Sequence, residues 1–429
     1  MSDKPNSDPR HAPITIIGGG LAGKMMALSL ATSCQERTDF DITLIAPDLV
    51  IDDEIAVSPK RDRRTTTIHA AGAAMLQALG VWEDKDDFRT PITSMAVAVG
   101  PQRPYHSDWV LEWQDTGTPM AYVVENHKLL TAFDQALAKL AKQAPSKITF
   151  INASVTDLSE QYDRAFLTLS DNSHLTSQLV IACDGANSAV RKQAGLTPHI
   201  QKTGQKAIVT NVRLEVPHNG LACQRFLETG PLALMPLNDE DGMAMMASVV
   251  WSTSTKEADR LMMLDEAALS HEITHAFGEE FGKLMICDTP SCFPLIPQFN
   301  RRLSKGHVLL AGDAAHAIHP LAGMGYNLAL ADAAILQDEL VQLAKAGLTA
   351  DHPSLSSNYH RRRLPEITAM SAVTSGLNHL LSRPKNPVTD LLASAMAVVN
   401  HTALKSQFRK IAMGGKLAKA PLLSGQNAK

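Results

Sequence analysis

The chain has 429 residues, of which 45% are hydrophobic and 20% are charged, and its formal net charge is −4. This length allows two or three domains with a core large enough to bury a cofactor, and the small net charge argues against nucleic-acid binding. The five cysteines are odd in number and form no CxxC pair, so they indicate neither a disulfide framework nor a metal site.

The first thirteen residues are polar and lack the apolar core of a signal peptide. No apolar run approaches the ~18 residues that a membrane span requires. We therefore expect a cytoplasmic protein, and peripheral attachment to the inner membrane stays open.

An apolar strand, Ile14–Ile17, is expected directly before a glycine-rich turn and an alanine-rich helix that runs to Ala31. Glycines in a GxGxxG pattern allow a tight turn and let a pyrophosphate reach the helix N-terminus. A strand before the pattern and a helix after it therefore predict dinucleotide binding. The residues of this turn are Gly18, Gly20, Leu21, Ala22 and Gly23.

The next strand, Asp41–Ile45, lacks the acid that usually binds the adenosine ribose. Ala46 occupies that position, and Asp48 follows two residues later. Either Asp48 reaches back to the ribose, or backbone groups and water replace the acid. This departure weakens the interpretation as a simple NAD-dependent dehydrogenase.

Residues 61–80 are expected to form a basic, threonine-rich turn and a helix that ends near Leu79. Between residues 91 and 124, prolines separate short apolar pieces that predict strands of a different sheet. A helix is then expected over Leu129–Lys142, where apolar residues keep helical spacing. The chain thus passes through a second sheet before this helix.

A further apolar strand, Leu179–Ala182, is followed by Asp184 and Gly185 and then by Ser188, a residue type typical of helix N-caps. This order predicts a carboxylate and free amides at the carboxyl edge of a sheet. From Lys206 to about Phe299 the pattern is β-rich, apart from one or two helices between residues 256 and 283.

The stretch from Gly306 to Leu340 joins an apolar strand, a Gly-Asp break and a helix rich in small residues. The aspartate can accept hydrogen bonds from ribityl hydroxyls, and the free N–H groups at the helix start can hold an electron-rich oxygen. A reduced flavin presents both groups together. The residues concerned are Gly312, Asp313, Gly323, Gly325, Tyr326 and Asn327.

The string GDAAHAIHPLAGMGYNLAL at residues 312–330 resembles the second flavin motif of the p-hydroxybenzoate hydroxylase class of FAD monooxygenases. Its HPLAGMGYNLAL part is most similar to the ubiquinone-biosynthesis hydroxylases. The resemblance implies that Asp313 binds the ribityl chain, that Pro320 lies beside the flavin ring, and that residues 325–327 face its pyrimidine end.

Three other segments carry the same resemblance. RTTTI implies that Arg64 lies over the flavin, YVVEN implies a cofactor contact at Asn126, and DGANSAVR implies FAD and pyridine-nucleotide contacts at Asp184 and Gly185. The implied fold is α/β, with a Rossmann-like FAD-binding domain (1–90, 125–200 and 300–345) interleaved with an antiparallel β-sheet substrate domain (91–124 and 201–299). A C-terminal helical region, 346–429, follows.

The resemblance further implies FAD held without a covalent bond, NAD(P)H or another electron donor, and dioxygen as co-substrate. The expected reaction is hydroxylation of a prenylated phenol in ubiquinone biosynthesis through a flavin C4a-hydroperoxide. Alternatives are a monooxygenase of another aromatic compound and a non-catalytic flavoprotein-like scaffold subunit. A flavin halogenase is disfavoured because the chain has no Trp-x-Trp pair.

No side chain is identified as a catalytic base, although Pro320, Tyr326 and His319 are candidates near the ring. His316 and His319 are spaced three residues apart, but no further ligand cluster supports a metal, so we expect both to make structural hydrogen bonds.

The end of the chain, Leu391–Lys429, has six Lys or Arg residues and no acid. It is interpreted either as a segment that packs on the protein itself or as a basic amphipathic surface for an anionic membrane or a ubiquinone-synthesis complex. The apolar stripe that suggests a helix consists of Leu391, Leu392, Ala395, Met396, Val399 and Ala403.

Overall fold

The structure is a computed structural model. It describes residues 9–33, 37–55, 62, 64–82, 88–100, 109–114, 119–161, 163–239, 241–323, 325–381 and 420–424.

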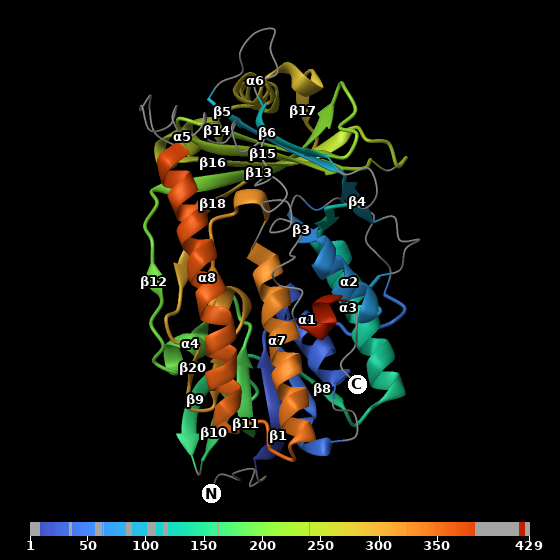
Figure 1. The fold of residues 1–429 in the computed structure, drawn as a ribbon, viewed down its shortest axis with the longest axis vertical. Coiled ribbons are helices and arrows are strands. Elements are labelled where there is room, and N and C mark those ends of the chain that lie inside the picture. The colour runs from blue at the N-terminus through green and yellow to red at the C-terminus, as the bar shows by residue number, and fades with distance from the viewer. Residues whose placement is uncertain are drawn as a thin grey trace, which may run out of the picture.

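The first sheet is the centre of the lower body in Figure 1. Its main order is β20-β21-β11-β1-β2-β8, and the hairpin of β9 and β10 extends β11. The four central pairings, from β21 to β8, are parallel, as is usual where connecting segments cross over a sheet. The strands are β1 (Arg10–Ile17), β2 (Ile42–Ala46), β8 (Ile148–Asn152), β9 (Val155–Gln161), β10 (Arg164–Leu169), β11 (His174–Ala182), β20 (Ser304–Lys305) and β21 (Val308–Leu310).

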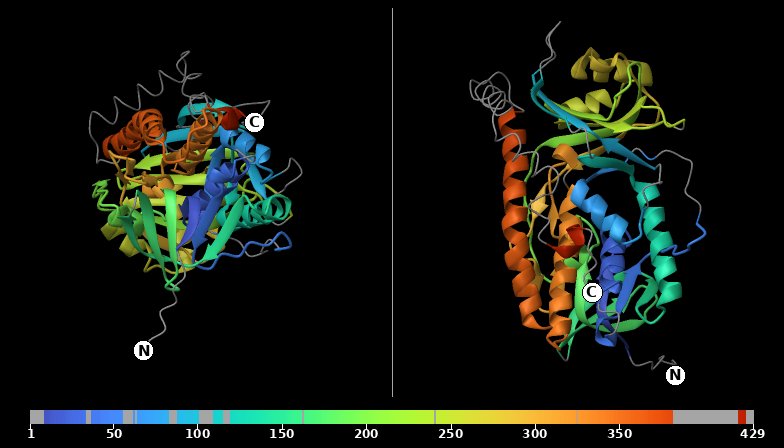
Figure 2. Two further views of the ribbon diagram at one scale, coloured as in Figure 1. Left: turned by 90° about the horizontal axis from the view of Figure 1, so that it is seen from below. Right: turned by 45° about the vertical axis from the view of Figure 1, so that its right-hand side comes forward.

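Helices α1 (Leu21–Ala31), α3 (Asn126–Gln143) and α7 (Gly325–Lys345) pack side by side against this sheet. Helix α8 (Pro353–Leu381) lies along α7 and reaches the second sheet, as Figure 1 and Figure 2 show. Proline usually interrupts a helix, but α8 continues through Pro365. Burial of Tyr359, Arg363 and Ile367 on one face compensates for the hydrogen bond that proline removes.

The second sheet crosses the top of the molecule in Figure 1, in the order β17-β13-β16-β15-β14-β5-β6. It is antiparallel except for the parallel β14–β5 pair, which joins two parts of the chain far apart in sequence. Helices α5 (Thr255–Leu261) and α6 (Glu266–Phe277) cover its outer face. The strands are β5 (Ser94–Val99), β6 (Trp109–Gln114), β13 (Gln205–Leu214), β14 (Leu221–Leu227), β15 (Gly230–Leu237), β16 (Met246–Ser254), β17 (Leu284–Ile286) and β18 (Ser291–Leu295), which pairs with β13.

Strand β15 shows why this sheet separates two cores. Leu232 and Leu234 join the cluster under α5 and α6, whereas Ala233, Met235 and Leu237 join a cluster on the opposite face. Side chains alternate across a strand, so each face collects every second residue. The apolar sequence of β15 therefore serves both faces.

Two three-stranded sheets connect the two bodies, in the orders β3-β7-β4 and β12-β19-β22. The segment at residues 65–69 was predicted as a turn, which is wrong. Its β-branched residues form β3, which pairs with β7. The strands are β3 (Thr65–His69), β4 (Arg89–Ile92), β7 (Ala121–Glu125), β12 (His199–Ile200), β19 (Gln298–Phe299) and β22 (His316–Ala317).

The remaining short elements include α2 (Ala70–Ala78) and α4 (Ala189–Gln193). The 3-10 turns are η1 (Thr38–Phe40), η2 (Glu279–Phe281), η3 (Gly312–Ala314), η4 (Leu321–Gly323) and η5 (Pro421–Ser424). Because β5 and β6 join the second sheet between elements of the first body, the predicted α/β fold with an interleaved, mainly antiparallel domain is confirmed.

The chain end returns to the first body. Turn η5 packs on α2 and α7, and Leu422 and Leu423 are buried in the main core. Most of the basic segment 391–429, including its predicted apolar stripe, lies outside the described residues. Within the described part, no helix is both long enough and apolar enough to cross a bilayer.

Candidate functional site

Three predicted segments meet at the carboxyl ends of β1, β11 and β21, which are neighbours in the first sheet. A Cβ atom at Gly18, whose φ is +129°, would lie 2.4 Å from the carbonyl oxygen of Cys183. A Cβ atom at Gly312 would lie 2.9 Å from Cβ of Ala22. The glycines therefore let the three loops approach more closely than any side chain would allow.

The glycine-rich turn leaves the start of α1 open. Gly20 is the N-cap of this helix, no side chain caps it, and a Cβ atom built there meets nothing within 4 Å. Leu21 and Ala22, in the first turn, are only half-buried. Gly23 faces inward instead, since its Cβ would lie 1.9 Å from the Gly18 carbonyl oxygen. The open N–H groups and helix dipole suit a pyrophosphate.

Asp184 follows β11, and only one of its two carboxylate oxygens has a hydrogen-bond partner within the described residues. Oδ2 accepts a hydrogen bond from the Val190 N–H at 3.2 Å, whereas the buried Oδ1 has no partner among the residues that the structure describes. The next residue, Gly185, has a φ of +84° and open space beside it. Ser188 caps α4 by accepting from the Arg191 N–H at 2.9 Å, as its sequence position predicted.

Asp313 follows Gly312, whose φ is +57°. Its side chain is exposed, yet desolvation raises the pKa of the carboxyl, with the His316 and Asp332 side chains acting in opposite directions. The carboxyl is thus accessible to solvent although protein atoms surround it closely. This is a suitable place for a ligand hydroxyl that donates to a carboxylate.

A fully buried ionic cluster supports this turn from behind. Asp332 of α7 accepts hydrogen bonds from the Gly312 N–H at 2.8 Å, from Arg363 Nε at 2.6 Å and from His316 Nε2 at 2.7 Å. Burial by itself would raise the pKa of Asp332, but the charges of His316 and Arg363 and these hydrogen bonds outweigh it and lower the pKa to about 2. The expected structural role of His316 is therefore observed.

Asp332 and Arg363 were not among the predicted site residues. Asp332 is a single charge within an alanine-rich, buried helix, which is a detectable signal because buried charges require partners. Arg363 lies in a run of three arginines, and its distinguishing feature is its four-residue spacing from Tyr359 and Ile367. Tyr359 donates to the Leu310 carbonyl oxygen at 3.1 Å, so α8 holds both β21 and the carboxylate behind it.

The start of α7 is fixed to β3 by Asn327. Its amide donates to the Thr67 carbonyl oxygen at 2.8 Å and accepts from the His69 N–H at 3.1 Å. This side chain therefore joins two elements, and only its backbone is left for a ligand. Gly323 lies against Thr67, where a Cβ atom would approach to 2.6 Å, whereas Gly325 has open space. Burial raises the pKa of Tyr326, so its hydroxyl stays protonated.

Two predicted residues lie further out. The Arg64 side chain is 63% exposed and its Nε is 3.8 Å from Asp62 Oδ1. Asn126 begins α3, and its Oδ1 accepts from the Thr66 hydroxyl at 2.6 Å. The structure thus ties Asn126 to β3 and leaves the Arg64 side chain largely in solvent.

The position after β2 that usually carries a ribose-binding acid carries alanine here. Ala46 is buried, and its Cβ would lie 2.9 Å from a Cβ atom at Gly19. Asp48 has a φ of +57° and an exposed side chain, and its N–H donates to Asn152 Oδ1 at 2.7 Å.

Pro320, half-buried, and His319, buried, lie between β22 and η4. Structural hydrogen bonds were expected for His319, but neither of its ring nitrogens has a partner within the described ranges. Those ranges also contain no group of three or more His, Cys, Asp or Glu side chains placed to hold a metal ion.

These residues fit a flavin dinucleotide. The uncapped start of α1 suits the pyrophosphate, and the exposed Asp313 suits a polyol. The unpartnered Asp184 oxygen lies between these two loops in strand order.

The comparisons with known proteins agree with this geometry. The sequence model of a family described as FAD binding domain matches residues 11–374. Ubiquinone hydroxylase UbiL of Rhodospirillum rubrum is 30% identical over 409 residues, which cover 95% of this chain and 91% of that protein. The chain belongs to the ubiquinone-biosynthesis FAD-dependent hydroxylase family.

Another relative is 3-demethoxyubiquinol 3-hydroxylase of Escherichia coli, which is 30% identical to this chain over 425 residues. The match covers 94% of this chain and 98% of that protein. Among solved structures, p-nitrophenol 4-monooxygenase PnpA of Pseudomonas putida superposes with a TM-score of 0.69 at 20% identity, over 98% of this chain and 100% of that one. At that identity the superposition supports the fold alone.

Proposed function

We propose that this member of the hydroxylase family is an FAD-dependent monooxygenase that hydroxylates the aromatic ring of a prenylated phenol in ubiquinone biosynthesis. The observation that carries the proposal is the meeting of the Gly20, Asp184 and Asp313 loops at one sheet edge. The printed names of the two bacterial relatives, a ubiquinone hydroxylase and a demethoxyubiquinol hydroxylase, support the substrate class.

In this proposal the α1 N-terminus binds the pyrophosphate and Asp313 binds the ribityl chain. Asp184 accepts a hydrogen bond from the cofactor, and the backbone at residues 325–327 faces the ring. Bound FAD would store two electrons, supplied by NAD(P)H or another donor, and activate dioxygen. The protein's contribution is to orient the ring, to offer free N–H groups to its electron-rich end and to keep bulk water away.

The apolar character of the second sheet agrees with a hydrophobic substrate. Its inner face carries a cluster of apolar side chains that includes Ala222, Ala233, Met235 and Met246, with Val250 half-buried beside it. Thr65 of β3 donates to the Ser248 hydroxyl at 3.0 Å, which fixes this face against the first body. These four apolar side chains are packed in a core, so an aromatic ring with an apolar chain would meet this face through its half-buried members, such as Val250.

The test is a quinone profile measured by mass spectrometry. Deletion of the gene is expected to remove ubiquinone and to accumulate a precursor that lacks one hydroxyl group, and the wild-type gene should restore the product. An unchanged quinone profile would contradict the substrate assignment and favour a monooxygenase of another aromatic compound.

Flavin content distinguishes the alternative, a non-catalytic scaffold subunit, from the proposed enzyme. It draws on Ala46, which replaces the usual ribose-binding acid with a buried methyl group. Purified protein that neither contains flavin nor takes it up would support a scaffold. Flavin absorbance near one FAD per chain would support the enzyme.

Peripheral attachment to a membrane or a quinone-synthesis complex, on the cytoplasmic side, is part of the proposal. Its support is the excess of six basic residues and no acid over Leu391–Lys429. Flotation with anionic vesicles measures this membrane attachment. Lys405→Glu combined with Arg409→Glu should release the protein from such vesicles, and retention of binding would contradict this surface.

A further inference from the structure

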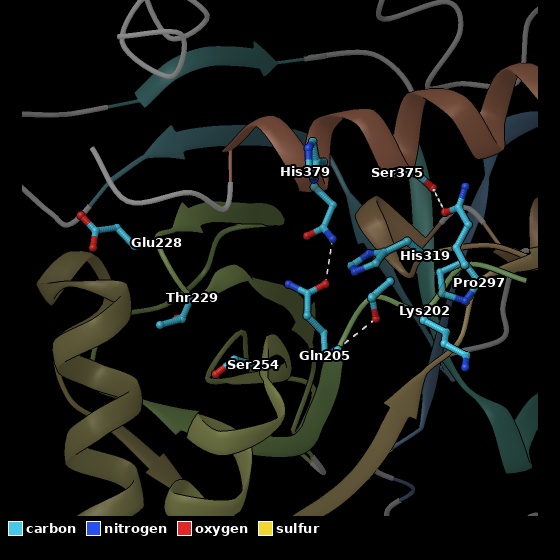
Figure 3. A pocket seen from close by; sticks show the side chains of 13 residues that line it. Lys202, Gln205, Glu228, Thr229, Ser254, Pro297, His319, Ser375 and His379 are labelled. Carbon is cyan, nitrogen blue, oxygen red and sulfur yellow. Dashed lines mark hydrogen bonds between the residues drawn. The ribbon is translucent and has the colours of Figure 1, made fainter. Parts of the chain in front are cut away.

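His319 is buried without the hydrogen bonds that its ring could make. The side chain is 1% exposed, and both Nδ1 and Nε2 lack a partner in the part of the chain that the structure describes. Figure 3 shows its ring pointing into a cavity, whose volume is about 570 Å³. A buried imidazole that faces space rather than a protein partner calls for a ligand or for water.

The cavity leads from the surface to this ring. Its rim carries the exposed residues Lys202, Glu228 and Thr229. Half-buried Gln205 forms part of the wall, and His319 lies at the buried inner end. The cavity therefore has solvent-exposed residues at its rim and a buried ring in its lining, as expected for a passage from solvent.

Hydrogen bonds hold the polar wall in place. Gln205 Oε1 accepts from Asn378 Nδ2 at 2.7 Å, and Gln201 Oε1 accepts from the Ser375 hydroxyl at 2.6 Å. The bonds join Gln201, just before β13, and Gln205, the first residue of β13, to the last turns of α8 (Figure 3). The cavity is thus a built feature between the two bodies.

The lining chemistry suits water better than other occupants. Lys202 and Glu228 place opposite charges at the rim, which gives little net attraction for an anion. Amide and hydroxyl groups on the wall disfavour an apolar prenyl chain. The amide, hydroxyl and charged groups of a mixed lining can offer several waters the two to four partners that each requires.

The protonation state of His319 suits proton transfer. Desolvation lowers its pKa to about 4, so the ring is neutral near pH 7, with one nitrogen donating and the other accepting. The other titratable groups that face the cavity are Lys202, Glu228 and His379, all on its exposed part. A neutral imidazole can accept a proton on one nitrogen and release one from the other.

We propose that this cavity is the path by which protons enter and product water leaves the flavin site, with His319 as the proton-transfer residue at its inner end. The inference rests on the proposed function. Conversion of an aromatic C–H bond and dioxygen, with two electrons and two protons, gives a phenolic C–OH group and one water. A site that excludes bulk water needs a separate path for these species, and His319 directly precedes Pro320, expected beside the ring.

The first experiment needs neither the substrate nor the physiological electron donor. Flavin bound to the protein is reduced by dithionite and then mixed with dioxygen. Anionic reduced flavin, dioxygen and one proton give oxidised flavin and hydrogen peroxide, and the return of flavin absorbance is followed in H₂O and D₂O. His319→Phe should slow this step by about tenfold or more and enlarge its solvent isotope effect.

Chemical rescue separates proton transfer from packing. His319→Ala leaves a space that imidazole can enter, so added imidazole should restore the rate in a saturable manner, whereas His319→Phe should not respond. Flavin content should match the wild type in both variants. The Tm of His319→Ala should fall because a buried ring is removed, and rescue of the rate by imidazole at unchanged flavin content separates proton transfer from this loss of packing.

A second variant blocks the passage without touching His319. Thr229→Trp at the exposed rim should slow the same step and enlarge its isotope effect. Met263→Trp, at a residue 86% exposed between α5 and α6, is the matched control and should behave as the wild type. A high-resolution crystal structure should show ordered waters from the rim to a ring nitrogen of His319.

Equal rates and equal isotope effects in His319→Phe, Thr229→Trp and the wild type would overturn the proposal, as would a cavity whose waters stop short of the ring. If the variants behave as expected but no prenylated phenol is hydroxylated, the passage stands and the proposed substrate fails. If hydroxylation occurs while the variants behave as the wild type, the passage fails alone.

Discussion

Two glycines of the same turn have different tasks at the scale of single residues. Gly23 faces the Gly18 carbonyl oxygen, whereas Gly20 faces open space at the start of α1. Gly23→Ala should therefore lower the Tm of the cofactor-free protein because its Cβ would clash with backbone. Gly20→Ala should keep that Tm and weaken FAD binding instead. Thermal unfolding with and without FAD separates the two effects, and equal losses of Tm without FAD would contradict this division.

The Asp313 carboxylate is exposed in a desolvated position, which is where a ribityl hydroxyl would gain most from it. Asp313→Ala is expected to weaken FAD binding by about 10- to 100-fold, because hydrogen bonds to charged groups contribute about 1.5–3 kcal/mol each. FAD fluorescence quenching measures the affinity. Asp157→Ala, an exposed aspartate on β9, is the control. Full affinity in Asp313→Ala would refute the placement of the ribityl chain.

At the scale of elements, the fully buried pair of Asp332 and Arg363 joins α7 to α8, beside the more exposed ion pairs that Arg362 makes with the same helix. Removing either partner leaves the other charge unpaired, which costs about 3–5 kcal/mol, whereas apolar replacement of both is often nearly neutral. Asp332→Leu and Arg363→Met should each strongly lower the free energy of unfolding in urea, and the double variant should lose less than their sum. Strictly additive losses would show that the two side chains act independently.

The low pKa of the Asp332 carboxyl predicts that the free energy of unfolding depends on pH in the acid range. The pKa of this group is about 2 in the folded protein and 3.8 without perturbation, so its contribution to stability is complete above about pH 5 and is lost progressively as pH falls through 2. Asp332→Asn cannot titrate. Between pH 5 and pH 3 the wild type should therefore lose about 1 kcal/mol more than this variant. Urea unfolding at both pH values measures the difference, and parallel losses would contradict the low pKa.

At the scale of the whole molecule, the chain end closes the first body. Leu422 and Leu423 of η5 are buried against α2 and α7. Leu422→Ala with Leu423→Ala should lower the free energy of unfolding by several kcal/mol, at about 2–5 kcal/mol for each buried leucine. Urea unfolding tests this, with Leu380→Ala at a residue 37% exposed on α8 as the control. Little change would mean that the end is only loosely attached.

The amino-acid sequence determined the local elements and where they belong. Strand, glycine turn and helix follow from short-range patterns at residues 14–31 and 306–340, and parallel strands bring the ends of such segments to one edge. It also placed glycine at Gly18 and Gly312, where the structure shows that a Cβ would meet the Cys183 carbonyl oxygen and the Ala22 side chain.

Only the tertiary structure decided how the polar side chains are paired. Arg363 reaches Asp332 across 31 residues, Asn327 bonds β3 across more than 250, and His319 is left without a protein partner. Helical spacing from Tyr359 and Ile367 distinguishes Arg363 from its two neighbours but does not name its partner, and no local pattern separates His319 from His316. The physical reason is that a buried polar group is stabilised by whichever distant group the packed fold places within hydrogen-bond reach, and that distance is a property of the packing of whole elements.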